Sequence, residues 1–458
     1  DDPGTAEIVL ESPDGSWWGP AEFSERGTQL LVTNYVSITD ARAHVVDLDS
    51  GDVTLLAGGP DAPGFNVPVA FDDDEDGFWL LTDRGSEFTQ LAWQSLEAGA
   101  DPVIVTTDIP WNVSDVAISD DRSRMAFAVN EGGTTALYLM DPKKKKYRRV
   151  EGMPVGVASA LEFSPDGSKL GLTLNTPQTP SDTFSLELGK RPLEHGKLVR
   201  WTYSEVGGLD TTTFVTPRLV RFPTFDEVGG KPREIPAWVY TPPGDGPFPV
   251  VVSIHGGPES QARPYFSSTY QLWLRELGVA VVVPNVRGSS GYGKTYVALD
   301  NGFRREDSVR DIGALLDWID AQEELDGDRV AVFGGSYGGY MVLASAVHYS
   351  DRLRAAVDIV GISSFVTFLE NTQDYRRDLR RVEYGDERDP EMRAFLEKIS
   401  PLNNVEKISV PMFVVQGQND PRVPVTEAEQ IVKALRENGH TVWYMNALNE
   451  GHGFRRKE

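Results

Sequence analysis

The sequence predicts an all-β, propeller-like domain over residues 1–215, followed by a doubly wound, mostly parallel α/β sheet over residues 216–458. Two observations predict this fold class. The first half repeats a pattern of short apolar strands, and the second half alternates strand-length apolar runs with amphipathic helical segments. The length agrees with two domains, because 458 residues exceed what one ordinary core accommodates.

The first half contains about four recognisable blade units. They begin with GPAEFSERGTQLLVTN, PVAFDDDEDGFWLLTD, DVAISDDRSRMAFAVN and ALEFSPDGSKLGLTLN, and the equivalent residues Phe23, Phe71, Ile118 and Phe163 are 48, 47 and 45 residues apart. Four short strands per unit at this period are typical of a propeller blade. An irregular β-sandwich is the alternative, but sandwiches rarely keep so even a period. Since four blades are near the minimum for closure, the propeller is either small or incomplete.

The second unit contains an acidic run, DDDEDG, beginning at Asp72. Asp72, Asp74 and Asp76 have the spacing of a calcium loop, and Asp83 falls at the twelfth position. However, the run lacks the closing glutamate and lies between two predicted strands rather than two helices. We therefore expect a solvated hairpin turn and predict no metal site.

From Phe248 onward the pattern changes to buried strands that end in glycine. These runs are FPVVVSIHGG, VAVVVPNVRG, RVAVFGGS, AAVDIVG and VPMFVVQG, and segments of helical periodicity separate them. Continuous apolar strands alternating with amphipathic helices indicate a parallel sheet covered on both faces. Ligands of such sheets bind beyond the carboxyl ends of the strands, so catalytic residues are expected in the loops that follow them.

Ser336 is the candidate nucleophile. It lies in GGSYG, between the predicted strand VAVF and a predicted helix, which is the context of a nucleophile elbow. The turn forces the serine into a costly conformation, so the positions two residues away must be glycines. The pattern alone is a weak signal, because glycine-rich strand-to-helix turns also bind phosphate.

A serine hydroxyl needs a base, and the base needs a carboxylate that orients it. The order Ser, Asp, His predicts His452 as the base, in the loop EGHGF after a predicted strand, whereas His440 is expected at a helix exit. Asp420 is the first carboxylate after the strand MFVVQG and is the predicted orienting acid. Donors for the oxyanion are expected from the backbone N–H groups of Tyr337 and Gly257.

Composition excludes several classes of function. A net charge of −25 and a pI near 4.7 argue against nucleic acid and anionic membranes as partners, and the run KKKK in DPKKKKYRR is expected to be a solvated turn. Without cysteine, neither disulfides nor thiolate sites exist. No apolar run is long enough to span a bilayer. We expect a soluble protein, cytoplasmic or, if a signal peptide was removed, periplasmic; the triad implies no cofactor.

Together, the motifs IHGGP, NVRGSSGYG, GGSYGGY, QGQNDPRVP and EGHGF, with propeller repeats before them, resemble the prolyl oligopeptidase family of serine peptidases, in particular its acylaminoacyl-peptidase and dipeptidyl-peptidase branches. The resemblance implies an α/β hydrolase domain capped by a propeller. The chain differs from the family pattern at both ends, since about four blade units precede the hydrolase domain and only six residues follow His452. Both ends are therefore expected to be shortened.

The resemblance implies a serine exopeptidase or oligopeptidase acting on short peptides. It also implies that Tyr337, Phe365, Phe368 and Val423 line the pocket for the residue before the scissile bond, although ordinary core is an alternative for the two phenylalanines. Hydrolysis is expected to fall on the acid side, where His452 becomes protonated. Two other functions stay open, an esterase of the same fold and an inactive propeller-hydrolase binding protein. A homo-oligomer is compatible with the sequence.

Overall fold

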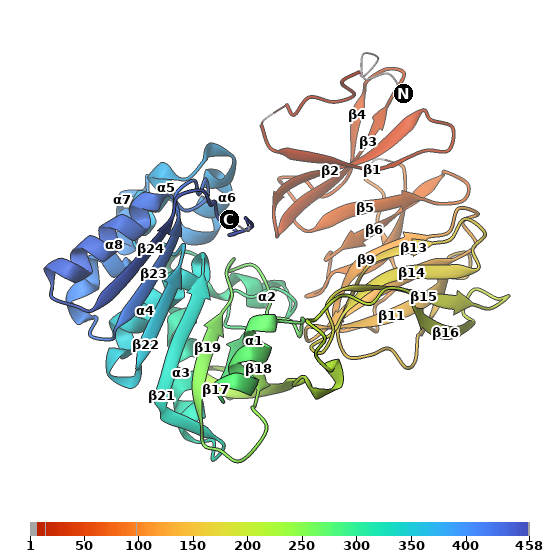
Figure 1. Ribbon diagram of the computed structural model, residues 1–458. Coiled ribbons are helices and arrows are strands. Elements are labelled where there is room, and N and C mark those ends of the chain that lie inside the picture. Colours follow the sequence, from red (N-terminus) through yellow and green to blue (C-terminus); the bar gives the residue numbers. More distant parts are fainter. Residues whose placement is uncertain (1–6, 14, 98, 457–458) are drawn as a thin grey trace. The chain divides into compact units, whose positions relative to one another are not determined.

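The computed structural model describes residues 7–13, 15–97 and 99–456. It divides into two compact units (Figure 1). The first unit contains the chain up to Gly207 together with Gly291–Lys294, and the second contains Gly208–Ser290 and the chain from Thr295 onward. The short segment Gly291–Lys294 thus belongs to the first unit although it lies in the second half of the sequence.

The first unit consists of four antiparallel sheets, and the strands of each sheet are neighbours in chain order, as in propeller blades (Figure 1). Blade 1 contains β1 (Trp17–Phe23), β2 (Gln29–Ser37), β3 (Asp40–Asp47) and β4 (Val53–Ala57); blade 2 contains β5 (Asn66–Phe71), β6 (Gly77–Thr82), β7 (Gln90–Ser95) and β8 (Val103–Ile104); blade 3 contains β9 (Asn112–Ile118), β10 (Met125–Glu131), β11 (Thr134–Asp141) and β12 (Lys146–Arg149); blade 4 contains β13 (Val157–Phe163), β14 (Lys169–Asn175), β15 (Asp182–Leu188) and β16 (His195–Arg200). The predicted propeller-like domain is confirmed.

The turn between the first two strands is closed in the same way in all four blades. Ser24, Ser119 and Ser164 each accept, at Oγ, a hydrogen bond of 3.0 Å from the backbone N–H five residues later. In blade 2 the equivalent residue is Asp72, whose Oδ1 accepts from the N–H of Gly77 over 3.2 Å. Short polar side chains favour such turns because they bond to nearby backbone groups. The repeat therefore extends to the turn chemistry.

Adjacent blades are held together by apolar clusters between their sheets. Each cluster joins two consecutive blades: Leu31 with Phe78 for blades 1 and 2, Trp79 with Phe127 for blades 2 and 3, and Leu137 with Leu170 for blades 3 and 4. All six side chains are at most 3% exposed. Packing between repeats thus forms most of the core of this unit, and a smaller cluster of Leu30, Val32 and Val46 lies within blade 1.

The second unit is built on one sheet with the strand order β17-β18-β20-β19-β21-β22-β23-β24. Pairing is antiparallel from β17 to β20 and parallel from β20 to β24. The strands are β17 (Arg218–Val228), β18 (Lys231–Tyr240), β19 (Phe248–Ile254), β20 (Ala280–Pro284), β21 (Leu325–Gly335), β22 (Ala355–Ile359), β23 (Met412–Gly417) and β24 (Val442–Ala447). This mostly parallel order is the predicted α/β hydrolase sheet.

Helices lie between these strands along the chain (Figure 1). They are α1 (Ser268–Glu276), α2 (Lys294–Val297), α3 (Asp307–Asp320), α4 (Tyr337–Tyr349), α5 (Phe365–Asn371), α6 (Asp374–Tyr384), α7 (Pro390–Ile399) and α8 (Val425–Glu437). Of these, α1, α3, α4 and α8 pack against strands of the sheet. The largest apolar cluster of the molecule lies between the sheet and α3, α4 and α8. Since β19, β21, β23 and β24 are parallel, their carboxyl ends lie at one edge of this rigid sheet, where the predicted catalytic loops follow.

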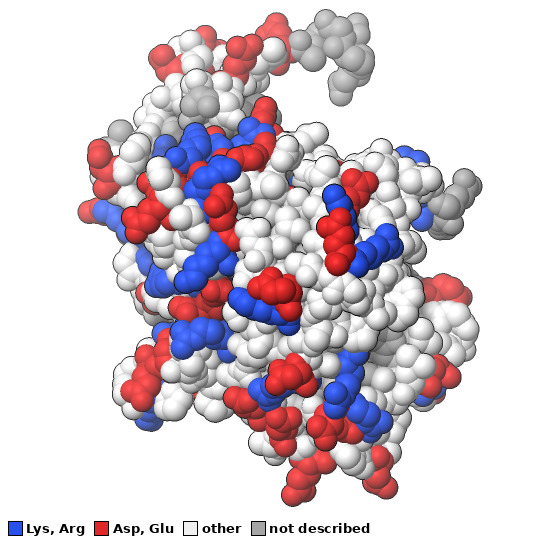
Figure 2. Space-filling view, turned by 90° about the vertical axis from the view of Figure 1, so that its left-hand side faces the viewer, with Lys and Arg blue, Asp and Glu red and all other residues white. Residues whose placement is uncertain are grey.

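The net charge of −25 does not appear as a separate acidic patch on the face shown in Figure 2. On the face shown in Figure 2, acidic and basic side chains are interspersed. Within the described part of the chain, no helix is long and apolar enough to cross a membrane.

Candidate active site

Ser336 lies alone between the last residue of β21 and the first residue of α4. Its backbone has φ 60° and ψ −122°, a conformation that costs a residue with a side chain about 1–3 kcal/mol. A Cβ atom at Gly334 would lie 2.4 Å from the carbonyl oxygen of Gly338, and one at Gly338 would lie 2.2 Å from that of Ile254. The flanking glycines therefore provide the room that the turn requires, as the motif predicts.

Asp420 and His452 follow the adjacent parallel strands β23 and β24 and are in contact. The Nδ1–H of His452 donates to Oδ2 of Asp420 over 2.6 Å, since a carboxylate can only accept. Oδ1 of Asp420 accepts the N–H groups of Arg422 and Val423 over 2.8 and 3.0 Å. The carboxylate side chain has no exposed surface, whereas that of His452 is 18% exposed. This arrangement presents Nε2 of His452 as the free ring nitrogen.

The two loops that carry this pair are tied together by further hydrogen bonds. Backbone N–H groups of Gln418 and Asn419 donate to the carbonyl groups of Ala447 and Glu450 over 3.0 and 2.9 Å. Among the described residues, no hydrogen bond joins Ser336 to His452. Catalytic hydrogen bonds are often long in unliganded structures and shorten when substrate binds.

The loop after β19 reaches the nucleophile. A Cβ at Gly256 would lie 3.3 Å from Cβ of Ser336, so the backbone of this loop passes directly beside the serine. Gly257 has φ +131°, a conformation that favours glycine. Tyr337 is the first residue of α4, so its N–H has no acceptor within the helix. The two predicted donors, the N–H groups of Tyr337 and Gly257, thus belong to the start of α4 and to the loop after β19.

His255 was not predicted to have a role, yet it anchors this loop. Its Nε2 lies 2.9 Å from Oγ of Ser289 and its Nδ1 lies 2.8 Å from the carbonyl oxygen of Gly256. Burial lowers the pKa of the His255 imidazole, which favours the neutral ring. The residue belongs to the motif IHGGP, so the motif carried a signal for it.

The residues predicted for the substrate pocket are buried. Phe365 has no exposed surface and packs against the rings of Tyr340 and Tyr384, with centroids 4.5 and 5.1 Å away. The burial of Phe365 fits the alternative of an ordinary core residue, and its role in the pocket stays a prediction. Phe368 and Val423 are 3% and 2% exposed, and their role in the pocket stays a prediction.

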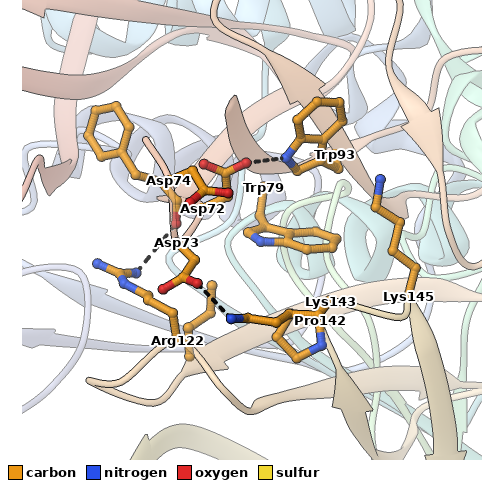
Figure 3. Close-up of a pocket in the computed structure, with 11 residues that line it drawn as sticks. Asp72, Asp73, Asp74, Trp79, Trp93, Arg122, Pro142, Lys143 and Lys145 are labelled. Atoms are coloured by element: carbon orange, nitrogen blue, oxygen red, sulfur yellow. Dashed lines mark hydrogen bonds and ion pairs between the residues drawn. The ribbon is translucent and has the colours of Figure 1, made fainter. Parts of the chain in front are cut away.

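The acidic run of blade 2 lines a pocket of about 420 Å³ on the first unit (Figure 3). Two of its carboxylates contact neighbouring side chains: Oδ2 of Asp72 accepts the indole N–H of Trp93 over 2.7 Å, and Asp73 pairs with Lys143 over 2.9 Å. Lys145 lies over the Trp93 ring, 4.4 Å from its centroid. Because Asp72 also closes the hairpin, the run has the role of a turn, and the lysines of the basic run lie in a turn beside it.

A known protein family matches the part of the chain that carries this site. The chain matches the prolyl oligopeptidase family over residues 264–458, a range that includes Ser336, Asp420 and His452. Residues 264–458 are a prolyl oligopeptidase family domain. The resemblance stated from the motifs is confirmed.

Relatives of the prolyl oligopeptidase family domain are longer than this chain. Dipeptidyl aminopeptidase BIII of Pseudoxanthomonas mexicana is 36% identical over 219 residues, which are 47% of this chain and 31% of the relative. Dipeptidyl-peptidase 5 of Aspergillus oryzae is 25% identical over an alignment of 496 positions, covering 98% of this chain and 62% of the relative. The chain thus spans less than two thirds of either protein.

The fold of the whole chain is also found among solved structures. A puromycin-hydrolyzing peptidase of Mycobacterium tuberculosis matches with a TM-score of 0.85 at 22% identity, over 100% of this chain and 69% of that one. At this identity the match shows a shared fold. It extends through the blades as well as the prolyl oligopeptidase family domain.

Proposed function

We propose that the protein is a serine peptidase that hydrolyses short peptides through an acyl-enzyme intermediate on Ser336. The observation that carries this proposal is the placement of a strained serine and a hydrogen-bonded Asp420–His452 pair after parallel strands of one sheet. Strain of this kind persists only where the surrounding structure enforces it, and it exposes the hydroxyl at the top of the sheet. In this proposal the predicted domain 216–458 carries the chemistry.

The proposed reaction has two halves. Oγ of Ser336 attacks the scissile carbonyl carbon while Nε2 of His452 takes the hydroxyl proton, and the N–H groups of Tyr337 and Gly257 stabilise the oxyanion. Protonated His452 then gives the proton to the leaving amine, and the carbon–nitrogen bond breaks. A water molecule, deprotonated by His452, attacks the resulting ester, releases the carboxylic acid and restores Ser336. Asp420 orients the imidazole throughout.

The names of the relatives support peptides as substrates. Both curated relatives are dipeptidyl peptidases by name, and the solved structure is of a peptidase. We propose that Phe365, Phe368 and Val423 form the wall of the pocket for the residue before the scissile bond. A short peptide with an apolar residue at that position is the substrate class that these side chains favour.

The test is labelling with a fluorophosphonate probe, with the adduct located by mass spectrometry, followed by kinetics on a panel of peptide and ester chromogens. We expect one adduct, on Ser336, and none in Ser336→Ala; turnover of peptides should accompany it. Turnover of esters without peptides would replace the peptidase with an esterase. Absence of any adduct and of any turnover would contradict the proposal and leave a binding protein.

A further inference from the structure

Four charged side chains are buried next to the proposed oxyanion donors. They belong to Asp300, Arg305, Arg380 and Glu383, which we call the buried ion cluster. Arg305 pairs with Asp300 over 2.5 Å, and Arg380 pairs with Glu383. The side chains of Asp300 and Arg305 have no exposed surface, that of Glu383 is 1% exposed and that of Arg380 is 12% exposed. The proposed mechanism uses none of them.

One side of this cluster holds the carbonyl group of Gly257. Nη1 of Arg380 donates to this oxygen over 3.0 Å, and the hydroxyl of Tyr384 donates to it over 3.3 Å. Both donors come from α6, more than 120 positions further along the chain. Gly257 lies at a positive φ and has no side chain that could fix the loop. The two contacts fix the peptide group that follows Gly257 and thereby, through its Cα atom, restrain the peptide group that carries its N–H.

The other side of the cluster holds Tyr337. Nη1 of Arg305 donates to the Tyr337 hydroxyl over 3.3 Å, and Oγ of Ser308 shares a hydrogen bond of 3.0 Å with it. The rings of Tyr337 and Tyr384 are stacked with centroids 5.9 Å apart. Because Nη2 of Arg305 also donates to the carbonyl of Glu383 over 2.6 Å, the two residues that carry the oxyanion donors are linked through one set of contacts.

Stability alone does not account for charges at this place. Burial of an ion pair costs several kcal/mol per ion, and apolar residues of similar volume often stabilise a protein as well or better. Charged groups provide hydrogen bonds of fixed direction, since the planar guanidinium group donates in a rigid geometry and its hydrogen bonds are strong in a low-dielectric interior. Directional contacts matter most where a backbone N–H must face a developing charge.

We propose that Arg380 and Tyr384 are positioning residues that hold the Gly257 N–H in register with the Tyr337 N–H for binding of the oxyanion. This inference rests on the proposed function. It assigns α6 a role in the reaction without contact between α6 and the reacting atoms. Loss of one oxyanion donor costs serine hydrolases about 10²–10³ in kcat, so partial misorientation should cost about 10- to 100-fold for Arg380→Gln and several-fold for Tyr384→Phe.

Two matched variants provide the controls. Arg381→Gln alters the next residue of α6, whose guanidinium pairs with Glu387 and Asp378 rather than with the buried ion cluster. Tyr349→Phe removes a hydroxyl that donates to a carbonyl oxygen over the same 3.3 Å, at Val309. Neither control contacts Gly257 or Tyr337.

The readouts are kcat, KM, and the affinities for a peptide boronic acid and for the product peptide. For Arg380→Gln and Tyr384→Phe we expect kcat to fall while KM stays within two-fold. The affinity for the boronic acid should weaken by the same factor as kcat, and product affinity should not change, because only the tetrahedral adduct needs both donors. Arg381→Gln and Tyr349→Phe should leave all four quantities within two-fold.

Two results overturn this inference while the proposed function stands, and both require an active parent protein. In the first, Arg380→Gln and Tyr384→Phe behave like their controls. In the second, these two variants show a raised KM and an unchanged kcat. If Arg380→Gln does not fold, Tyr384→Phe decides, because it removes one oxygen atom and keeps the ring. A parent protein that is neither labelled at Ser336 nor active overturns the proposed function instead, and this inference with it.

Discussion

Replacement of Asp420 by asparagine should abolish most activity without unfolding the protein. The carboxylate uses its two oxygens differently: Oδ1 accepts two backbone N–H groups, and Oδ2 accepts the Nδ1–H of His452. An asparagine must keep its oxygen toward the two backbone donors, because its NH₂ group cannot accept. The NH₂ group then faces Nδ1, which becomes an acceptor, so the ring proton moves to Nε2. An imidazole protonated at Nε2 cannot take the proton of Ser336.

The size of this effect follows from the tautomer. The same substitution in a serine protease triad lowers kcat by about 10⁴, which corresponds to about 5.4 kcal/mol of transition-state stabilisation. Stability should change little by comparison, within about 2 kcal/mol, because the asparagine keeps both backbone hydrogen bonds and only the charge is lost. Activity and stability should therefore separate.

The assay compares kcat/KM on a peptide chromogen with the midpoint of urea unfolding. Asp378→Asn is the control, since that carboxylate is 85% exposed and lies outside the proposed site. A loss of activity below ten-fold in Asp420→Asn, in a protein that still labels at Ser336, would refute the assignment of Asp420 as the orienting acid. A loss of stability as large as the loss in activity would refute the tautomer argument.

Three further substitutions test other parts of the molecule. Gly338→Ala should destabilise the fold by about 2 kcal/mol or more, because the new Cβ would lie 2.2 Å from a backbone oxygen at the end of β19; an unchanged urea midpoint would contradict this. Burial, and then the charge of Glu383, raise the pKa of the Glu259 carboxyl to about 8, so the folded protein keeps a proton that the unfolded chain releases above about pH 4.3. The free energy of unfolding should therefore decrease as pH rises toward 8. The Tm of Glu259→Gln minus the Tm of the parent should be larger at pH 8.5 than at pH 5, and an equal Tm difference at the two pH values would exclude this effect. Phe365→Ala should cost about 3–5 kcal/mol of stability, measured by urea unfolding, because the ring is fully buried. A changed KM at unchanged stability would instead show that Phe365 acts in the pocket and not in the core.

Local patterns were sufficient to predict the architecture because each repeat and each strand carries its own signal. The even spacing of Phe23, Phe71, Ile118 and Phe163 corresponds to four real blades, since the equivalent residue precedes the same turn each time. Strand order could not be predicted in the same way. β20 lies between β18 and β19, a pairing that depends on contacts between distant parts of the chain and leaves no periodic trace in the sequence.

The candidate site was predictable to the extent that its residues follow strands. Ser336 comes directly after a parallel strand, and Asp420 and His452 lie in the loops that follow two others, so the topology places them at one edge. Arg380 and Tyr384 gave no such signal. They lie in DYRRDLRRVEY, which has the composition of a solvated helix, and nothing in it indicates that one guanidinium contacts Gly257.

Because of the backbone conformation of Ser336, the Cβ atom that carries its hydroxyl destabilises the folded chain. Glycine adopts φ 60° and ψ −122° without the penalty that a side chain carries there, so Ser336→Gly should raise the free energy of unfolding by about 1–3 kcal/mol. A laboratory evolution experiment that rewards heat resistance alone would therefore discard the nucleophile. A screen for thermostable variants of this protein must therefore measure turnover in the same round, because selection for stability alone would yield inactive variants.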